Sequence, residues 1–172
     1  MNIDPKELRQ VAATETPRMD LYAGIHKALR ALMADTLLAL GRMDPQDNLE
    51  VAQVTQRVLQ LLDFCASHLK HENEFVHAAI EARAPGASAV IAHEHEGHES
   101  HILELSAAAT TLLETPADYR SRLAHHLYGQ LALFIADNFQ HMHVEETAHN
   151  AVLWARYTDA ELAAIHGALV AS

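Results

Sequence analysis

VAQVTQRVLQLLDFCASHLKHE, residues 51–72, contains no glycine or proline and has the apolar period of an amphipathic helix. Steps of three and four residues keep side chains on one face of such a helix. Here they pass through Val51, Val54, Val58, Leu61, Cys65, His68 and Glu72, and they continue to Phe75 and Ala79. Because an unpaired polar group in a core costs roughly 1 to 3 kcal/mol, the histidine and the carboxylate must either reach water or hold something.

The rest of the chain has the same helical character. Only 6 glycines and 5 prolines occur among 172 residues, of which 49% are hydrophobic, and this balance favours helices over a turn-rich β fold. Turn-forming residues gather at 41–48, 82–88 and 115–118. They divide the chain into long segments with helical periodicity, at about 17–42, 48–83, 88–114 and 118–154.

A further helix is predicted by TDAE at 158–161, which has the capping-box pattern before an apolar run. We therefore expect an all-α fold, an up-down-up-down antiparallel four-helix bundle with a short extra C-terminal helix. The chain, 1–172, is expected to form a single domain, with the bundle at about 17–154 and the C-terminal helix at about 158–170. The first sixteen residues are expected to hold one short helical turn.

Charge and composition disfavour several classes of partner. The formal net charge is −11 with histidine neutral, whereas nucleic acids and anionic membranes are bound through basic patches. The single cysteine, Cys65, rules out an internal disulfide and is compatible with a reducing compartment. Neither a secretory signal nor a run of roughly 18 apolar residues is found. We expect a cytoplasmic protein that binds neither nucleic acid nor membrane.

Histidine is the residue whose frequency departs from the ordinary, with 14 copies. The inward stripe of every long segment carries at least one. In chain order they are His26, His68 with Glu72, His95 and His98, and His141 with Glu145. In a bundle with short loops, the depth of each residue follows from its distance to the turn, at about 1.5 Å per residue. By this measure all of these side chains fall in one layer.

Such a layer has the composition of a metal site. Five histidines and two carboxylates exceed what one tetrahedral zinc needs, and they are about the number that two octahedral metals share through bridging carboxylates. Imidazole and carboxylate without a thiolate cluster suit iron or manganese better than copper(I) or structural zinc. The pattern therefore predicts a dinuclear site, most naturally of iron, with manganese or zinc as other occupants.

These residues resemble the hemerythrin HHE cation-binding family in type, order and interval. That family has a histidine on helix 1, His-x-x-x-Glu on helix 2, one or two histidines on helix 3, and histidine followed by a carboxylate on helix 4. The resemblance covers about residues 18–157 and implies that Glu72 and Glu145 bridge two non-heme irons, with an oxo or hydroxo bridge in the oxidised state and histidines as terminal ligands. It also implies oxygen or another diatomic as the partner, for carriage, storage or sensing.

Two details of the ligand set stay open. Oxygen-carrying hemerythrins place their two helix-3 histidines four residues apart, whereas His95 and His98 are three apart, so either one or both could ligate. The carriers also place the last carboxylate five residues after the histidine. That spacing would select Glu146, whereas the inward stripe favours Glu145.

Other polar residues have simpler interpretations. The Glu-x-x-His signature of ferritin-like bundles occurs at Glu74/His77 and Glu146/His149, but the first pair lies off the inward stripe. Cys65 is expected to be a small core residue, and Tyr22 to pack one turn before His26 with its hydroxyl near the site. Surface or outer-shell roles are expected for the remaining histidines, which are His71, His77, His93, His101, His125, His126, His143, His149 and His166.

Several functions are compatible with this pattern. The first is a protein that binds oxygen or iron, and we expect a binding protein rather than an enzyme. A diiron enzyme, peroxidase-like, nitric-oxide-reducing or acting in iron-centre repair, needs a substrate route that the sequence does not reveal. A regulator would need an effector domain or partner chain, and the fifth helix could cover the bundle or join a homodimer.

Two alternatives lie outside this class. A bundle that holds heme through two histidines would leave the carboxylates without a role, and the sequence lacks a Cys-x-x-Cys-His motif. A metal-free bundle would leave the buried polar groups unexplained.

Overall fold

The computed structural model describes residues 4–13, 16 and 18–172, and within these ranges it contains helices and no strand. The elements are α1 Pro5–Ala12, α2 Ala23–Arg42, α3 Asn48–His71, η1 Glu72–His77, α4 Ala78–Arg83, α5 Ala89–Glu114, α6 Ala117–Val144, η2 Glu145–His149, α7 Asn150–Arg156 and α8 Asp159–Val170. The elements η1 and η2 are π-helical, and each continues the preceding helix without a break. The all-helical fold expected from the periodicity is confirmed.

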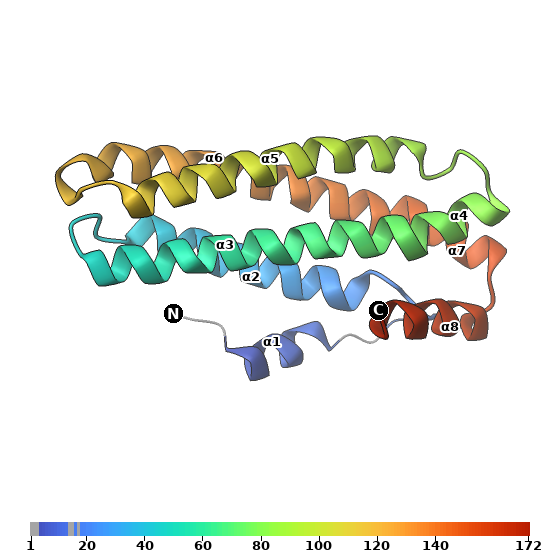
Figure 1. Cartoon of the computed structure of the whole chain (residues 1–172). Helices are drawn as coiled ribbons and strands as arrows, with labels where there is room; N and C mark the ends of the chain where they lie inside the picture. Colours follow the sequence, from blue (N-terminus) through green and yellow to red (C-terminus); the bar gives the residue numbers. More distant parts are fainter. Residues whose placement is uncertain (1–3, 14–15, 17) are drawn as a thin grey trace.

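The long helices α2, α3, α5 and α6 form a bundle (Figure 1). α3 contacts α2 and α5, and α6 contacts the same two helices, so the contacts close into a ring. The connections at 43–47, 84–88 and 115–116 are short, as the expected up-down-up-down order requires, and that order stays a prediction. α1 is longer than the single turn expected, and it packs against α2.

Local sequence explains where several helices begin. The Asp47 carboxylate accepts hydrogen bonds from the backbone N–H groups of Leu49 and Glu50, which caps α3. Thr158 and Glu161 form the predicted capping box at the start of α8. Between α4 and α5 the chain turns at Gly86, whose φ of 85° is costly for residues with a Cβ. These signals fix where α3, α5 and α8 begin.

The apolar core has two parts. A main cluster comes from α2, α3, α5 and α6 and from Met43, and includes Leu61, Leu131 and Phe134. A smaller end cluster consists of Leu21, Tyr22, Val76, Ile80, Leu153 and Leu162. Along α2, along α3 with η1, and along α6 with η2, the predicted ligand residues occur between members of these two clusters.

The inward stripe shifts by one residue beyond Glu72 and again beyond Glu145. Phe75 and Ala79, expected inside, are only half-buried, while Val76 and Ile80 are buried. On the fourth long segment the α-helical period, continued from His141 and Glu145, predicts Ala148 and Val152 inside, whereas His149 and Leu153 are the buried residues. The predicted stripes hold as far as Glu72 and Glu145 and are wrong beyond them. The prediction used the α-helical period throughout, whereas the wider π-helical turn adds a residue and rotates the following side chains.

No helix in the described part of the chain combines the length and the hydropathy that crossing a membrane requires.

Candidate metal centre

The junctions between α- and π-helix place two His-x-x-x-Glu pairs inside the bundle. His68 is in the last turn of α3 and Glu72 is the first residue of η1. His141 and Glu145 occupy the same positions at the end of α6 and the start of η2. α2 contributes His26 and α5 contributes His95. We call these six residues the central cluster, and all except the half-buried His68 are buried.

One half of the central cluster consists of His95 and His141 beside both carboxylates. Their Nε2 atoms are 3.0 Å apart, and they lie 3.7 and 3.4 Å from Oε1 of Glu145. The Nε2 atom of His95 is also 3.7 Å from Oε2 of Glu72. These atoms, taken from α5, α6, η1 and η2, lie within 4.8 Å of one another, so they could share one cation.

The other half consists of His26 and His68 beside the remaining carboxylate oxygens. The Nε2 atoms of His26 and His68 lie 3.3 and 3.2 Å from Oε1 of Glu72. The Nε2 atom of His26 is also 3.5 Å from Oε2 of Glu145. Each carboxylate therefore turns one oxygen toward each pair of histidines, which is the arrangement of a carboxylate that bridges two cations.

Partners on the outer side of three rings leave the inner nitrogens free to bind a cation. The Nδ1–H of His95 donates to Oδ1 of Asn73 at 2.8 Å, and that of His141 donates to Oε2 of Glu94 at 2.8 Å. The Nδ1 of His26 lies 3.2 Å from Oε1 of Glu146. A proton held at Nδ1 leaves the neutral ring's lone pair on Nε2, and metal-binding histidines are oriented in this way.

Arg30 in turn anchors Glu146, which is the other carboxylate weighed from the sequence. Its guanidinium donates two hydrogen bonds to Glu146, at 2.5 and 3.1 Å. Hydrogen bonds from His26 and Arg30 outweigh the effect of partial burial and lower the pKa of Glu146 to about 2. Glu145 reaches the centre of the cluster, whereas Glu146 binds the outer side of one of its rings.

Several atoms of the central cluster are buried without a hydrogen-bond partner. Among the described residues these include Nε2 of His68, Oε2 of Glu72 and both carboxylate oxygens of Glu145. Leaving such groups unsatisfied costs about 1 to 3 kcal/mol each, and more for charged groups. Unpaired lone pairs that converge on the same space fit a cation, so the residues present suit the bridging metals that the sequence predicts.

The electrostatics agree with this conclusion. Burial by itself would raise the pKa of Glu145, but the neighbouring imidazoles of His141 and His95, 3.4 and 3.7 Å away, hold it well below its usual range. Burial would lower the pKa of His26, whereas Glu146 and Glu72 raise it to about 9. Without metal, a proton on His26 therefore balances part of the carboxylate charge. A bound cation would displace that proton.

A family comparison also indicates cation binding. Residues 19–149 match the model of the hemerythrin HHE cation-binding domain. The chain belongs to this family. The matched range of the hemerythrin-like domain includes every predicted ligand, whereas α1 and α8 lie outside it. A search of curated proteins gives no match.

His98 lies beside the central cluster of the hemerythrin-like domain rather than in it. It is buried, and its ring centroid is 4.7 Å from that of His141 and 6.1 Å from that of Phe134. Of the two helix-3 candidates, only His95 belongs to a group of atoms close enough to share a cation. The Nδ1 atom of His98 is buried without a hydrogen-bond partner.

Sequence reasoning assigned no ligand role to two histidines that the structure places against the cluster. His77 and His149, the last residues of η1 and η2, are 5% and 2% exposed, and with Glu145 they form a further group of potential ligands. An α-helical period puts His77 on another face from Glu72, whereas the wider π-helical turn brings residues five apart much closer to one face. The signal that could have revealed them is a histidine shortly after each ligand glutamate: His77 has four residues between it and Glu72, and His149 has three between it and Glu145.

Two other expectations concern Cys65 and Tyr22. Cys65 is buried in the main cluster, as expected of a small core residue, and burial raises its pKa to about 12. The Tyr22 hydroxyl lies 3.0 Å from Nδ1 of His149. Tyr22 therefore reaches the centre through a histidine that the sequence interpretation placed outside it.

Proposed function

We propose that this hemerythrin-like domain holds two iron ions and binds oxygen or another diatomic for carriage, storage or sensing. The observation that supports this most strongly is the symmetry of the central cluster. Two pairs of histidines, His26 with His68 and His95 with His141, face opposite oxygens of Glu72 and Glu145. Two ferrous ions held by these side chains would supply electrons to a bound diatomic.

The donor set supports iron as the occupant. Each half of the cluster offers imidazole nitrogen and carboxylate oxygen, which suit iron, manganese and zinc. The described residues include one cysteine, and Cys65 belongs to the main apolar cluster. Capture of iron itself, with the same ligands, is the other binding function that this arrangement supports.

The surroundings favour a sheltered centre. The main cluster begins within one turn of the ligands on several helices, for example at Leu29, Leu69 and Met142, all of which are buried. Apolar walls limit the access of water, and this protects a bound diatomic from protons. The domain would therefore hold its ligand rather than release reduced products.

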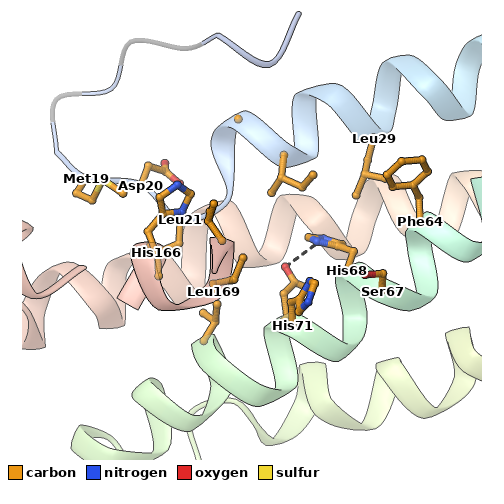
Figure 2. A pocket seen from close by; sticks show the side chains of 15 residues that line it. Met19, Asp20, Leu21, Leu29, Phe64, Ser67, His68, His71, His166 and Leu169 are labelled. Carbon is orange, nitrogen blue, oxygen red and sulfur yellow. Dashed lines mark ion pairs between the residues drawn. The ribbon is translucent and has the colours of Figure 1, made fainter. Parts of the chain in front are cut away.

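A cavity offers a route from solvent to the centre (Figure 2). Its volume is about 480 Å³, and it lies between α2, α3, η1 and the end of α8. His68 and Glu72 belong to its wall, and most of the other lining side chains are apolar, such as Leu21, Phe64 and Leu169. Figure 2 shows His68 and His71 on one side of the cavity and His166 on another. Access to the metal would pass His68, the half-buried member of the cluster.

The same cavity favours a second candidate function. A volume of about 480 Å³ is far larger than a diatomic needs and falls in the range of pockets for small organic molecules. A diiron enzyme, peroxidase-like or nitric-oxide-reducing, would use such space for a substrate or a reductant. The cavity thus gives the enzyme class the substrate route that the sequence does not reveal.

Metal analysis with optical spectroscopy tests the proposal. Untagged protein is reconstituted anaerobically with ferrous iron, freed of unbound metal, analysed for elements, and recorded before and after air is admitted. We expect at least two irons per chain, no colour in the reduced state and new near-ultraviolet bands in air. Reversal when oxygen is removed indicates a carrier or sensor, whereas consumption of added peroxide or nitric oxide over many turnovers indicates the enzyme.

Substitutions connect this result to the central cluster. Glu72→Ala and His141→Ala should each lower the iron content below two per chain and weaken the bands. Glu99→Ala, which removes an exposed carboxylate of α5, is the matched control and should behave as the wild type. If folded variants keep two irons, the ligand assignment is wrong. If the wild type takes up no metal, a metal-free or heme-binding bundle is the better explanation.

A further inference from the structure

A third group of ligand atoms lies against the central cluster. His77 comes from the end of η1, His149 comes from the end of η2, and Glu145 belongs to both groups. One ligand atom from each residue can be chosen so that all lie within 4.8 Å of one another. The three side chains are 5%, 2% and 0% exposed, so the group is closed to bulk solvent.

One nitrogen of each histidine in this group lacks a partner among the described residues. Nε2 of His77 and Nε2 of His149 are both buried without a hydrogen bond, as are the two oxygens of Glu145. The His77 ring stacks on that of His95, with centroids 4.9 Å apart, and meets the ring of His149 edge-on at 5.3 Å. An apolar side chain would fill either histidine position without an unsatisfied atom, so packing alone does not explain the two imidazoles.

One of the two histidines is oriented from its outer side. The Tyr22 hydroxyl lies 3.0 Å from Nδ1 of His149. When Nδ1–H donates to the hydroxyl oxygen, the lone pair of the neutral ring is on Nε2, the atom without a partner. Asn73 and Glu94 orient His95 and His141 in the central cluster by the same kind of contact.

We propose that His77, His149 and Glu145 form a third cation position beside the dinuclear centre. Two imidazoles and one carboxylate select a divalent transition metal, Fe²⁺ or Zn²⁺, over Mg²⁺ or Ca²⁺. A carboxylate offers about four lone-pair sites on its two oxygens, so Glu145 can bridge the pair and still bind a third ion. The inference rests on the proposed function because Glu145 is shared. Repulsion from the first two cations makes this position the last to fill.

Metal stoichiometry tests this position. Metal-free protein is loaded anaerobically with excess Fe²⁺ and, in a parallel sample, with Zn²⁺, freed of unbound metal and analysed for elements. We expect three ions per chain in the wild type, and two in His77→Leu and in His149→Leu. His93→Leu, which removes a histidine whose side chain is 85% exposed, should keep three. Circular dichroism verifies that each variant is folded.

The possible outcomes separate the two proposals. Two ions in the wild type and in both variants, with unchanged near-ultraviolet bands in air, would overturn the third position and leave the dinuclear centre standing. Fewer than two ions in a folded His77→Leu would also overturn it, since His77 would then serve the pair. A wild type without bound metal would instead defeat the proposed function itself.

A crystallographic measurement avoids dependence on the variants. Crystals of the zinc-loaded wild type, measured at the zinc absorption edge, should give an anomalous peak within bonding distance of Nε2 of both His77 and His149. This peak should be separate from the peaks of the dinuclear centre. Absence of a third peak from fully loaded crystals contradicts the proposal.

Discussion

α3 and α6 each pass through two different halves of the bundle. In the first half their inward side chains follow the α-helical period and pack into the main apolar cluster, as Val58, Leu61 and Leu131 do. In the second half the same helices become π-helical at Glu72 and Glu145, and the buried face turns to histidine and carboxylate. The interior of the first half is mainly apolar, whereas the second half contains buried polar atoms that a cation would satisfy.

The difference shows what the π-helical segments contribute. A regular helix would present one ligand pair, His-x-x-x-Glu, and then return to the apolar stripe. The added residue moves His77 and His149 inward and shifts the apolar stripe to Val76, Ile80 and Leu153. Single π-helical turns are rare and occur often at functional sites. Two of them at the same depth indicate that this half is shaped for ligand binding.

The largest effect on stability is expected in the apolar half. Leu61 is fully buried in the main cluster, so Leu61→Ala should lower the free energy of unfolding by about 2 to 5 kcal/mol. Iron content should stay at the wild-type value because no ligand is touched. Chemical denaturation and elemental analysis measure the two quantities. Leu103→Ala, on an exposed leucine, is the control, and loss of iron in Leu61→Ala would show that the two halves are not independent.

Substitution of Glu146 is expected to weaken metal binding rather than the apolar core, because Glu146 contacts the outer nitrogen of His26. Removal of such a partner lowers metal affinity about 10- to 100-fold. Glu146→Ala should therefore weaken iron binding by that factor and leave the main cluster intact. Competition with a chelator measures the affinity, with Glu99→Ala as the control. An unchanged affinity would mean that Arg30 and Glu146 form only a surface ion pair.

The pH dependence of the metal-free protein should distinguish the halves further. Burial, with the nearby histidines, lowers the pKa of His77 and of His98 to about 4 in the folded state, against an ordinary value of 6.5. Below pH 6.5 these histidines bind protons in the unfolded chain but stay neutral in the folded chain, so the free energy of unfolding falls from pH 6.5 toward pH 4. His26 acts oppositely, because its pKa is raised to about 9 in the folded state. Its contribution to the free energy of unfolding is complete below pH 6.5 and is lost as the pH rises from 6.5 to 9.

Thermal unfolding at pH values from 4 to 9 measures both the acid limb of the stability curve, below pH 6.5, and its alkaline limb, above pH 6.5. His98→Leu should flatten the acid limb by an amount on the order of 1 kcal/mol and leave the alkaline limb unchanged. Thr110→Ala, on an exposed side chain of α5, serves as the control. If the acid limb keeps its full slope in His98→Leu, the loss of stability at acid pH comes from groups other than His98.

The smallest effect is expected outside both halves. Thr158 caps α8, whose end lines the cavity beside His68. Loss of the cap in Thr158→Ala should lower the free energy of unfolding by about 0.5 to 1 kcal/mol, with no change in the number of ions bound. Calorimetry measures the first and elemental analysis the second. A change in metal content would connect α8 directly to the centre.

Much of the molecule could be predicted from periodicity. Steps of three and four residues located the long helices and carried His26, His68, His95 and His141 to the inward face, because α-helical geometry is a local property. The capping box at Thr158 was equally legible, since it depends on residues three apart. The all-helical fold and the family follow from these local patterns.

Tertiary structure decided the rest. Whether a helix widens into a π-helical turn depends on what packs around it, so the inward position of His77, five residues after Glu72, was not legible at the α-helical period. His149 and Ala148 both fit that period after Glu145, and the structure shows that His149 is the buried one. The roles of Glu145 and Glu146 are separated by Arg30, which lies 116 residues earlier in the chain. The sequence alone included all six members of the central cluster among its candidate ligands, whereas the packing of η1 and η2 decided which lone pairs converge and added His77 and His149.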